Sequence, residues 1–177
     1  DEAIPFEQIH DEHFLPALHE GMKIARENLT RIRENKETPN FENTILALET
    51  AAEDFERVQG IYFNLFSAEA SESRQGLAKQ ISPLSAAFAS EVALDEKLFE
   101  KIKSVFENRE KLYLSDEQVR LVEKFYKDFS RNGALLNNAD KEKLKSIDQE
   151  LSILGPQFSE NLLKATNDFE LLIDSKT

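Results

Sequence analysis

Apolar side chains recur every three or four residues through almost the whole sequence. This spacing places them on one face of an α-helix, whereas a half-buried strand would need strict alternation. Only five glycines and five prolines occur among 177 residues, so few positions interrupt a helix. The pattern predicts an all-α fold, an array of about six amphipathic and mostly antiparallel helices. A chain of this length is sufficient for one helical domain with a substantial core.

Capping and turn residues mark where the helices begin. The first helix is expected over residues 11–34, and its apolar face consists of Phe14, Leu18, Met22, Ala25, Leu29 and Ile32. The others begin after Asn40, near Ser71, after Asp95, after Ser115 and near residues 138–140. Ser115 and Gln118 have the spacing of a capping box, and Gly133 is placed to close the helix that they open. Pro83 is expected to kink its helix, and Gly155-Pro156 to interrupt and bend the last one.

The last expected helix has an apolar face like the others. Its members are Leu144, Ile147, Leu151, Leu154, Phe158, Leu162 and Ala165. Periodicity does not distinguish a face that packs within the chain from one that packs on another part of the protein. The pattern changes after Asn167, and Phe169 to Ile173 is predicted to be a short extended segment. Residues 168–177 are interpreted as the start of a connection to a following part.

The charge balance excludes several classes of partner. Lys and Arg number 22 against 34 Asp and Glu, a net charge of −12. An acidic surface without a basic patch repels phosphate backbones and acidic lipids, so we expect neither nucleic-acid nor membrane binding. No run is long and apolar enough to span a bilayer, and no secretory signal pattern is recognised at the start. The absence of cysteine excludes disulfides and thiolate metal sites. We expect a cytoplasmic protein, with the periplasm as the alternative.

The three histidines do not have the spacing of a zinc site. Two zinc-binding imidazoles on one helix face need a separation of four residues, with a glutamate beside the first. His10 and His13 are three apart where a helix begins, and His13 and His19 are six apart. Asp11 and Glu12 suit a helix N-terminus instead. We therefore predict no catalytic, cofactor-binding or metal-binding residue in this chain.

The sequences of several segments resemble those of one enzyme family. The segment Thr38-Pro39-Asn40-Phe41-Glu42-Asn43-Thr44-Ile45 is similar to the "P-T-F-E-N-T-I" segment of the zinc oligopeptidases grouped with thimet oligopeptidase, oligopeptidase A and peptidyl-dipeptidase (dipeptidyl carboxypeptidase). The resemblance begins near Pro5-Phe6 and continues through Tyr126 to Phe129 and on to Leu162. Tyr62 to Leu65 and Ile81 to Pro83 look most like the peptidyl-dipeptidase branch.

The resemblance implies a function for a longer protein. Such enzymes, peptidase family M3, are mostly helical, with a deep channel between two halves and a zinc ion held by an H-E-x-x-H helix and a later glutamate. The resemblance implies that residues 1–177 are an N-terminal helical domain that helps to wall the channel, with the catalytic half of the same chain and short peptides as partners. It implies release of C-terminal dipeptides, and a chain that by itself binds no zinc and is inactive.

Two alternatives remain open from the sequence. The chain could be a stand-alone acidic helical bundle that binds a partner helix or assembles with itself. It could also be a four-helix metal carboxylate protein, which needs Glu-x-x-His pairs on facing helices. Glu7 to His10 is the only such pair, and it lies before the first expected helix. Peptide specificity, exo against endo cleavage, and the residues that face the channel are not set by the sequence.

Overall fold

The computed structural model describes residues 4–170, and in this range every regular element is a helix. The α-helices are α1 (Phe14–Glu34), α2 (Ala47–Ala51), α3 (Glu53–Ala68), α4 (Glu72–Ala93), α5 (Glu96–Asn108), α6 (Asp116–Phe129) and α7 (Asn138–Asn167). Short 3₁₀ or π turns join them: η1 (Phe6–Gln8), η2 (Asp11–His13), η3 (Phe41–Leu46), η4 (Arg109–Lys111) and η5 (Ser130–Ala134). The all-α prediction is confirmed.

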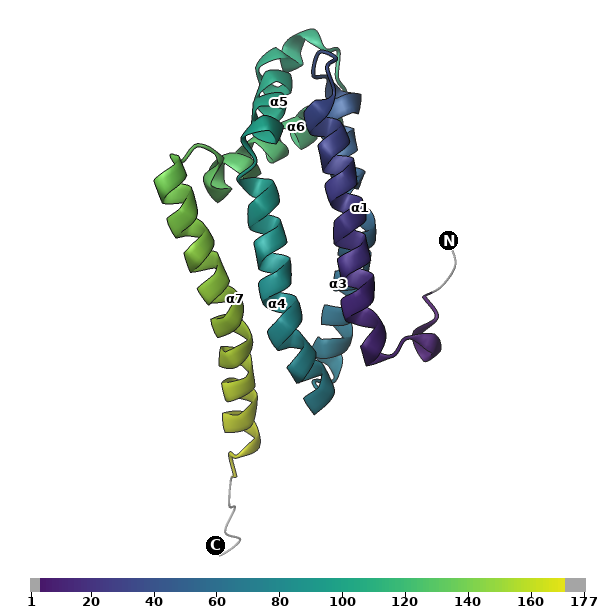
Figure 1. The fold of residues 1–177 in the computed structure, drawn as a ribbon, viewed down its shortest axis with the longest axis vertical. Helices are drawn as coiled ribbons and strands as arrows, with labels where there is room; N and C mark the ends of the chain where they lie inside the picture. Colours follow the sequence, from purple (N-terminus) through teal and green to yellow (C-terminus); the bar gives the residue numbers. More distant parts are fainter. Residues whose placement is uncertain (1–3, 171–177) are drawn as a thin grey trace, which may run out of the picture.

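Two antiparallel helix pairs make up the length of the molecule (Figure 1). α1 packs against α3, and α4 packs against α7, whereas α1 and α4 touch much less. α5 and α6 pack on each other at one end, beside the C-terminal end of α1. α7 therefore lies at the edge of the array, with a neighbour on one side.

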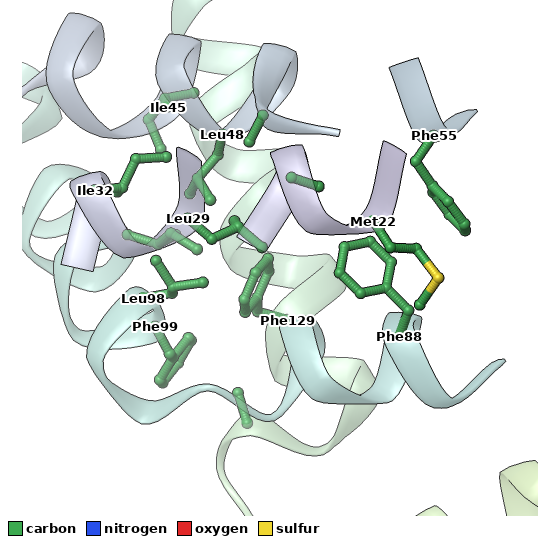
Figure 2. Packing of buried hydrophobic residues seen from close by; sticks show 14 of the residues in the cluster. Met22, Leu29, Ile32, Ile45, Leu48, Phe55, Phe88, Leu98, Phe99 and Phe129 are labelled. Atoms are coloured by element: carbon green, nitrogen blue, oxygen red, sulfur yellow. The ribbon is translucent and has the colours of Figure 1, made fainter. Parts of the chain in front are cut away.

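The core lies mainly between α1, α3, α5 and the segments that adjoin them (Figure 2). α1 supplies its most regular wall, because every residue of its predicted apolar face is buried. These residues are Phe14, Leu18, Met22, Ala25, Leu29 and Ile32. Edge-to-face aromatic pairs add to the packing, with ring centroids 5.2 Å apart for Phe14 and Tyr62 and 4.9 Å for Phe55 and Phe88.

The capping residues act as the sequence predicts. The side chains of Asn40, Asp95 and Ser115 accept hydrogen bonds from the backbone N–H groups of Asn43, Leu98 and Gln118. Each bond satisfies a donor that has no partner within its own helix. Gly133 adopts a φ of +98°, a left-handed conformation that glycine tolerates and other residues rarely adopt, so it ends the α6 segment.

The helix expected after Asn40 is interrupted. It consists of η3, α2 and α3, and Ala52 leaves helical geometry with φ −114° and ψ 15°. The side chain of Asn28 on α1 donates a hydrogen bond to the Ala51 carbonyl oxygen at 3.1 Å. This tertiary contact replaces a bond that a continuous helix would make, and local sequence does not reveal it.

The last helix is continuous where the sequence predicted an interruption. α7 is one continuous helix from Asn138 to Asn167 with Pro156 inside it, so Gly155-Pro156 does not interrupt it. α4 also runs through Pro83 as one helix, and its kink stays a prediction. A proline removes a single backbone bond, and the bonds on either side keep the helix continuous. Most of the apolar face of α7 is exposed in this structure, a point that periodicity had left open.

The predicted extended segment at Phe169 to Ile173 is not confirmed. Phe169 and Glu170 belong to no helix or strand, and residues 171–177 lie outside the described part of the chain. None of the helices in residues 4–170 is long and apolar enough to cross a membrane.

Candidate functional site: a groove between α3, α4 and α7

An open groove of about 850 Å³ lies between α3, α4 and α7. α4 forms its floor, α2 and α3 form one wall, and α7 forms the other, with α6 at one end. Small residues of α4 line the floor, together with buried aromatic side chains. The small residues are Ser82, Ser85, Ala86, Ala89 and Ala93, and the aromatic ones include Phe55, Phe88 and Phe129.

Charged groups stand only at the rim of the groove. Glu49 and Glu56 lie on the wall made by α2 and α3, and both are exposed. At the α6 end, Lys124 forms an ion pair with Asp128, the Lys Nζ lying 3.1 Å from the carboxylate oxygen. Glu49 and Glu56 have no such pair among residues 4–170. The groove is therefore apolar inside and acidic along one edge.

One polar atom is buried in the floor. The Ser85 Oγ has no hydrogen-bond partner among the described residues, and the side chain is only 7% exposed. Ser90, five residues further along α4, instead donates a hydrogen bond to the Asp148 carboxylate on α7 at 2.9 Å. α4 therefore contacts α7 through polar and small side chains.

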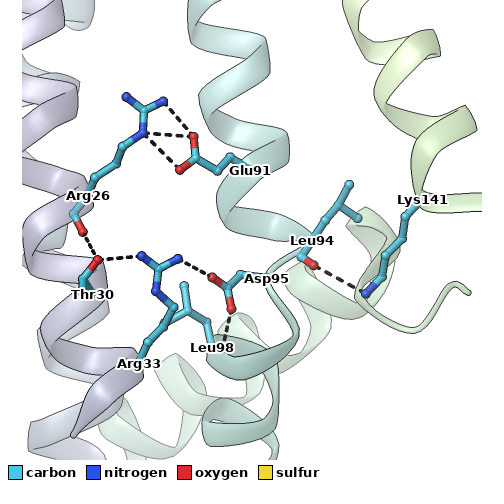
Figure 3. Close-up of polar contacts among 8 residues, drawn as sticks. All are labelled: Arg26, Thr30, Arg33, Glu91, Leu94, Asp95, Leu98 and Lys141. Atoms are coloured by element: carbon cyan, nitrogen blue, oxygen red, sulfur yellow. Dashed lines mark hydrogen bonds and ion pairs between the residues drawn. The ribbon is translucent and has the colours of Figure 1, made fainter. Parts of the chain in front are cut away.

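Ion pairs hold the helices around this groove in place (Figure 3). The Arg26 guanidinium on α1 binds the Glu91 carboxylate on α4 through two nitrogens, the shorter contact being 2.7 Å. Arg33 Nη1 binds Asp95 at 2.7 Å, and the same carboxylate caps α5. Lys141, which is buried, reaches Glu96 at 2.9 Å and fixes the beginning of α7. These contacts join α1, α4, α5 and α7.

A buried tyrosine joins the other end of the array. The Tyr62 hydroxyl on α3 donates a hydrogen bond to the Arg74 carbonyl oxygen at 2.7 Å. Burial, and then the nearby Asp11 carboxylate, raise the pKa of Tyr62 to about 12. Arg74 itself contacts Asp11 at 3.3 Å. This cluster packs the segment before α1 against α3 and α4, and it offers no open site for a ligand.

The histidines do not form a metal site. The backbone N–H of His10 donates to His13 Nδ1 at 3.2 Å, so one ring nitrogen serves the turn before α1. His10, His13 and His19 are all exposed. Within residues 4–170 no three His, Cys, Asp or Glu side chains lie close enough to hold a metal ion. The described residues therefore do not fit a zinc ion.

Similar known proteins indicate a family for the chain, which the geometry alone does not. The chain is 37% identical over 169 residues, 96% of its length, to dipeptidyl carboxypeptidase of Escherichia coli strain K12. It is 33% identical over 173 residues, 98% of its length, to dipeptidyl carboxypeptidase of Salmonella typhimurium. The chain belongs to the dipeptidyl carboxypeptidase and oligopeptidase A family. No protein-family model matches it.

Within this family the chain corresponds to an N-terminal region. Its identity to oligopeptidase A of Escherichia coli is 26% over 172 residues, below the identity to both dipeptidyl carboxypeptidases. This order agrees with the branch that the sequence resembles. The chain spans about a quarter of the length of the family members that it matches, 25% for each of these three.

Sequence reasoning did not find the groove. Its floor is composed of serine and alanine, which are ordinary in any helix, and its walls are far apart in the sequence. One signal was present: Ser82, Ala86, Ala89 and Ala93 recur at three- and four-residue spacing on α4. Small residues at this spacing allow another backbone to approach closely.

Proposed function

We propose that the chain is a non-catalytic N-terminal part of a zinc metallopeptidase that hydrolyses short peptides and releases C-terminal dipeptides. The observation that carries this proposal is the match of almost the whole chain to a quarter of two dipeptidyl carboxypeptidases. In such an enzyme the chain would form part of the wall of the peptide channel, and the remainder of the polypeptide would hold the zinc ion.

The chemistry of the chain supports a non-catalytic role for it and a zinc site in the remainder of the polypeptide. A zinc peptidase lowers the pKa of a metal-bound water and needs imidazole or carboxylate ligands that converge on one point. The exposed histidines near α1 do not converge in this way. We therefore propose that the complete polypeptide carries an H-E-x-x-H motif outside residues 1–177. The cytoplasm stays the predicted compartment, with the periplasm as the alternative.

Activity of two purified proteins tests the proposal. We expect the complete polypeptide to release dipeptides from the C-termini of short peptides, as measured by mass spectrometry, and to lose this activity with a zinc chelator. The 177-residue chain should release nothing under the same conditions. Chelator-sensitive hydrolysis by the 177-residue chain would contradict its non-catalytic role. An open reading frame without H-E-x-x-H would contradict the proposal that the complete protein is a zinc peptidase.

A further inference from the structure

α7 exposes most of its large apolar side chains. The exposed fractions are 52% for Ile147, 59% for Leu151, 53% for Leu154, 71% for Phe158 and 58% for Leu162. These five residues, here called the α7 stripe, recur at three- and four-residue spacing and share one side of the helix. The side that meets α4 instead carries Lys145, Asp148, Ser152 and Pro156.

The α7 stripe meets the groove at Leu151. Leu151 and Ser152 line a hollow of about 430 Å³ together with Ala86, Ala89 and Ala93 of α4. The same three alanines, with Ser152, also line the groove. Through Leu151 the stripe adjoins the groove, and the two form an apolar surface on α3, α4 and α7.

We propose that this surface is the docking site for an amphipathic helix contributed by the part of the same polypeptide that lies outside residues 1–177. This inference rests on the proposed function, because it takes the chain to be part of a longer peptidase. An exposed apolar surface of this extent marks a place where another protein segment packs. The alanine and serine floor allows a helix to approach α4 closely, while the α7 stripe and Phe63 would contact its sides.

The length of the relatives identifies the occupant. The chain matches 25% of each dipeptidyl carboxypeptidase, so the remaining three quarters of those proteins lie outside the match. A segment of the same polypeptide is present at high effective concentration and needs no separate association step. The surface is also contiguous with α7, which is the last described helix of the chain.

Charge further defines the occupant and disfavours a second copy. Glu49 and Glu56 stand at the groove rim without an ion pair among the described residues. A lysine or arginine of the docked helix, placed towards α3, would pair with them. In a symmetric pairing of two copies, each acidic rim would approach the same face of a chain whose net charge is −12.

The proposal also limits where peptides bind. A face that is covered by the rest of the polypeptide does not contact substrate. The groove and the α7 stripe are therefore removed from the surfaces that could line the channel, and the channel wall would lie on another face of the array.

Cysteine labelling tests the proposal, because the chain contains no cysteine. Leu151→Cys and Phe158→Cys place a thiol on the α7 stripe. Gln149→Cys is the matched control, since Gln149 is exposed on α7 and lines a hollow on the other side, with Ala87 and Glu91. Each variant is made in the 177-residue chain and in the complete polypeptide. The rate of maleimide labelling at each position is then measured by mass spectrometry of the labelled peptide.

We expect all three thiols to react rapidly in the 177-residue chain. In the complete polypeptide, Cys at 151 and 158 should react at least about tenfold more slowly, while Cys at 149 keeps its rate. Circular dichroism of each variant checks folding, which exposed positions should not disturb. Equal rates at 158 in the two proteins would overturn the proposal, and so would equal protection at 149.

Three further measurements test for other occupants of the surface. They also distinguish failure of the docking proposal from failure of the proposed function. Protection in the 177-residue chain that grows with concentration, together with a doubled mass, would assign the surface to a second copy instead. Protection that arises only on addition of a short peptide would make it a substrate site and overturn the proposal. Peptidase activity is assayed on the same samples. Protected thiols without activity would reject the proposed function alone, and active enzyme with unprotected thiols would reject the docking site alone.

Discussion

Gly21 on α1 lies directly against the backbone of Phe55 on α3. A Cβ atom on residue 21 would come within 2.9 Å of the Phe55 Cα and 3.0 Å of its backbone nitrogen. Backbone atoms cannot move aside as a flexible side chain can, so the absence of a side chain at residue 21 sets how closely the two helices approach.

Gly21→Ala should therefore destabilise the chain. Alanine favours the helix by about 1 kcal/mol, but forcing α1 and α3 apart costs about 1–3 kcal/mol, so we expect a net loss. Gly60→Ala is the control, because no atom lies within 4 Å of a Cβ at this position on α3. It should stabilise by about 0.5–1 kcal/mol. Urea denaturation of both variants measures the difference, and an equal gain in stability would contradict the close approach.

Asp95 combines a helix cap with an ion pair, and two variants separate these roles. Asp95→Ala removes both the bond to the Leu98 N–H and the contact with Arg33. We expect a loss of about 1–2 kcal/mol from the cap alone, and more from the half-buried Arg33 that is left without its carboxylate. Asp95→Asn keeps a capping oxygen and should lose less than Asp95→Ala. Equal loss in the two variants, measured by thermal unfolding, would show that the cap contributes little.

Tyr62 should make stability depend on alkaline pH. Its pKa is about 12 in the folded chain against an ordinary value of 10.0, so the folded state holds the phenol proton more tightly. The contribution of Tyr62 to the free energy of unfolding is therefore complete below pH 10, and it is lost as the pH rises from about 10 to about 12. The difference in absorbance at 295 nm between the wild type and Tyr62→Phe reports this titration. A midpoint near 10 would contradict the raised pKa.

Ser85 and Ser90 predict opposite responses to the same substitution. Ser85→Ala removes a buried hydroxyl that has no partner among the described residues, so it should be neutral or stabilise by about 1 kcal/mol. Ser90→Ala removes the bond to Asp148 that joins α4 to α7, and should destabilise by about 1 kcal/mol. Chemical denaturation of the 177-residue chain compares them. A loss of stability from Ser85→Ala as large as that from Ser90→Ala would contradict this assignment.

Local sequence was sufficient to predict most of the helices and the residues that cap them. The apolar face of α1 was predicted in full, because residues from Phe14 to Ile32 share one side of a helix and all are buried. Asn40, Asp95 and Ser115 cap helices through bonds to residues three positions away, which lie within the reach of a sequence pattern. The break at Ala52 was not predicted, because the hydrogen bond at Ala51 comes from Asn28 on another helix.

The sequence by itself determined that α7 is an amphipathic helix and which of its residues are apolar. Only the tertiary structure decided that these residues face away from α4, and that Leu151 among them adjoins a groove whose floor and walls come from separate helices. The physical reason is that periodicity records the side on which a helix is apolar, while the partner that covers this side depends on contacts between distant parts of the polypeptide.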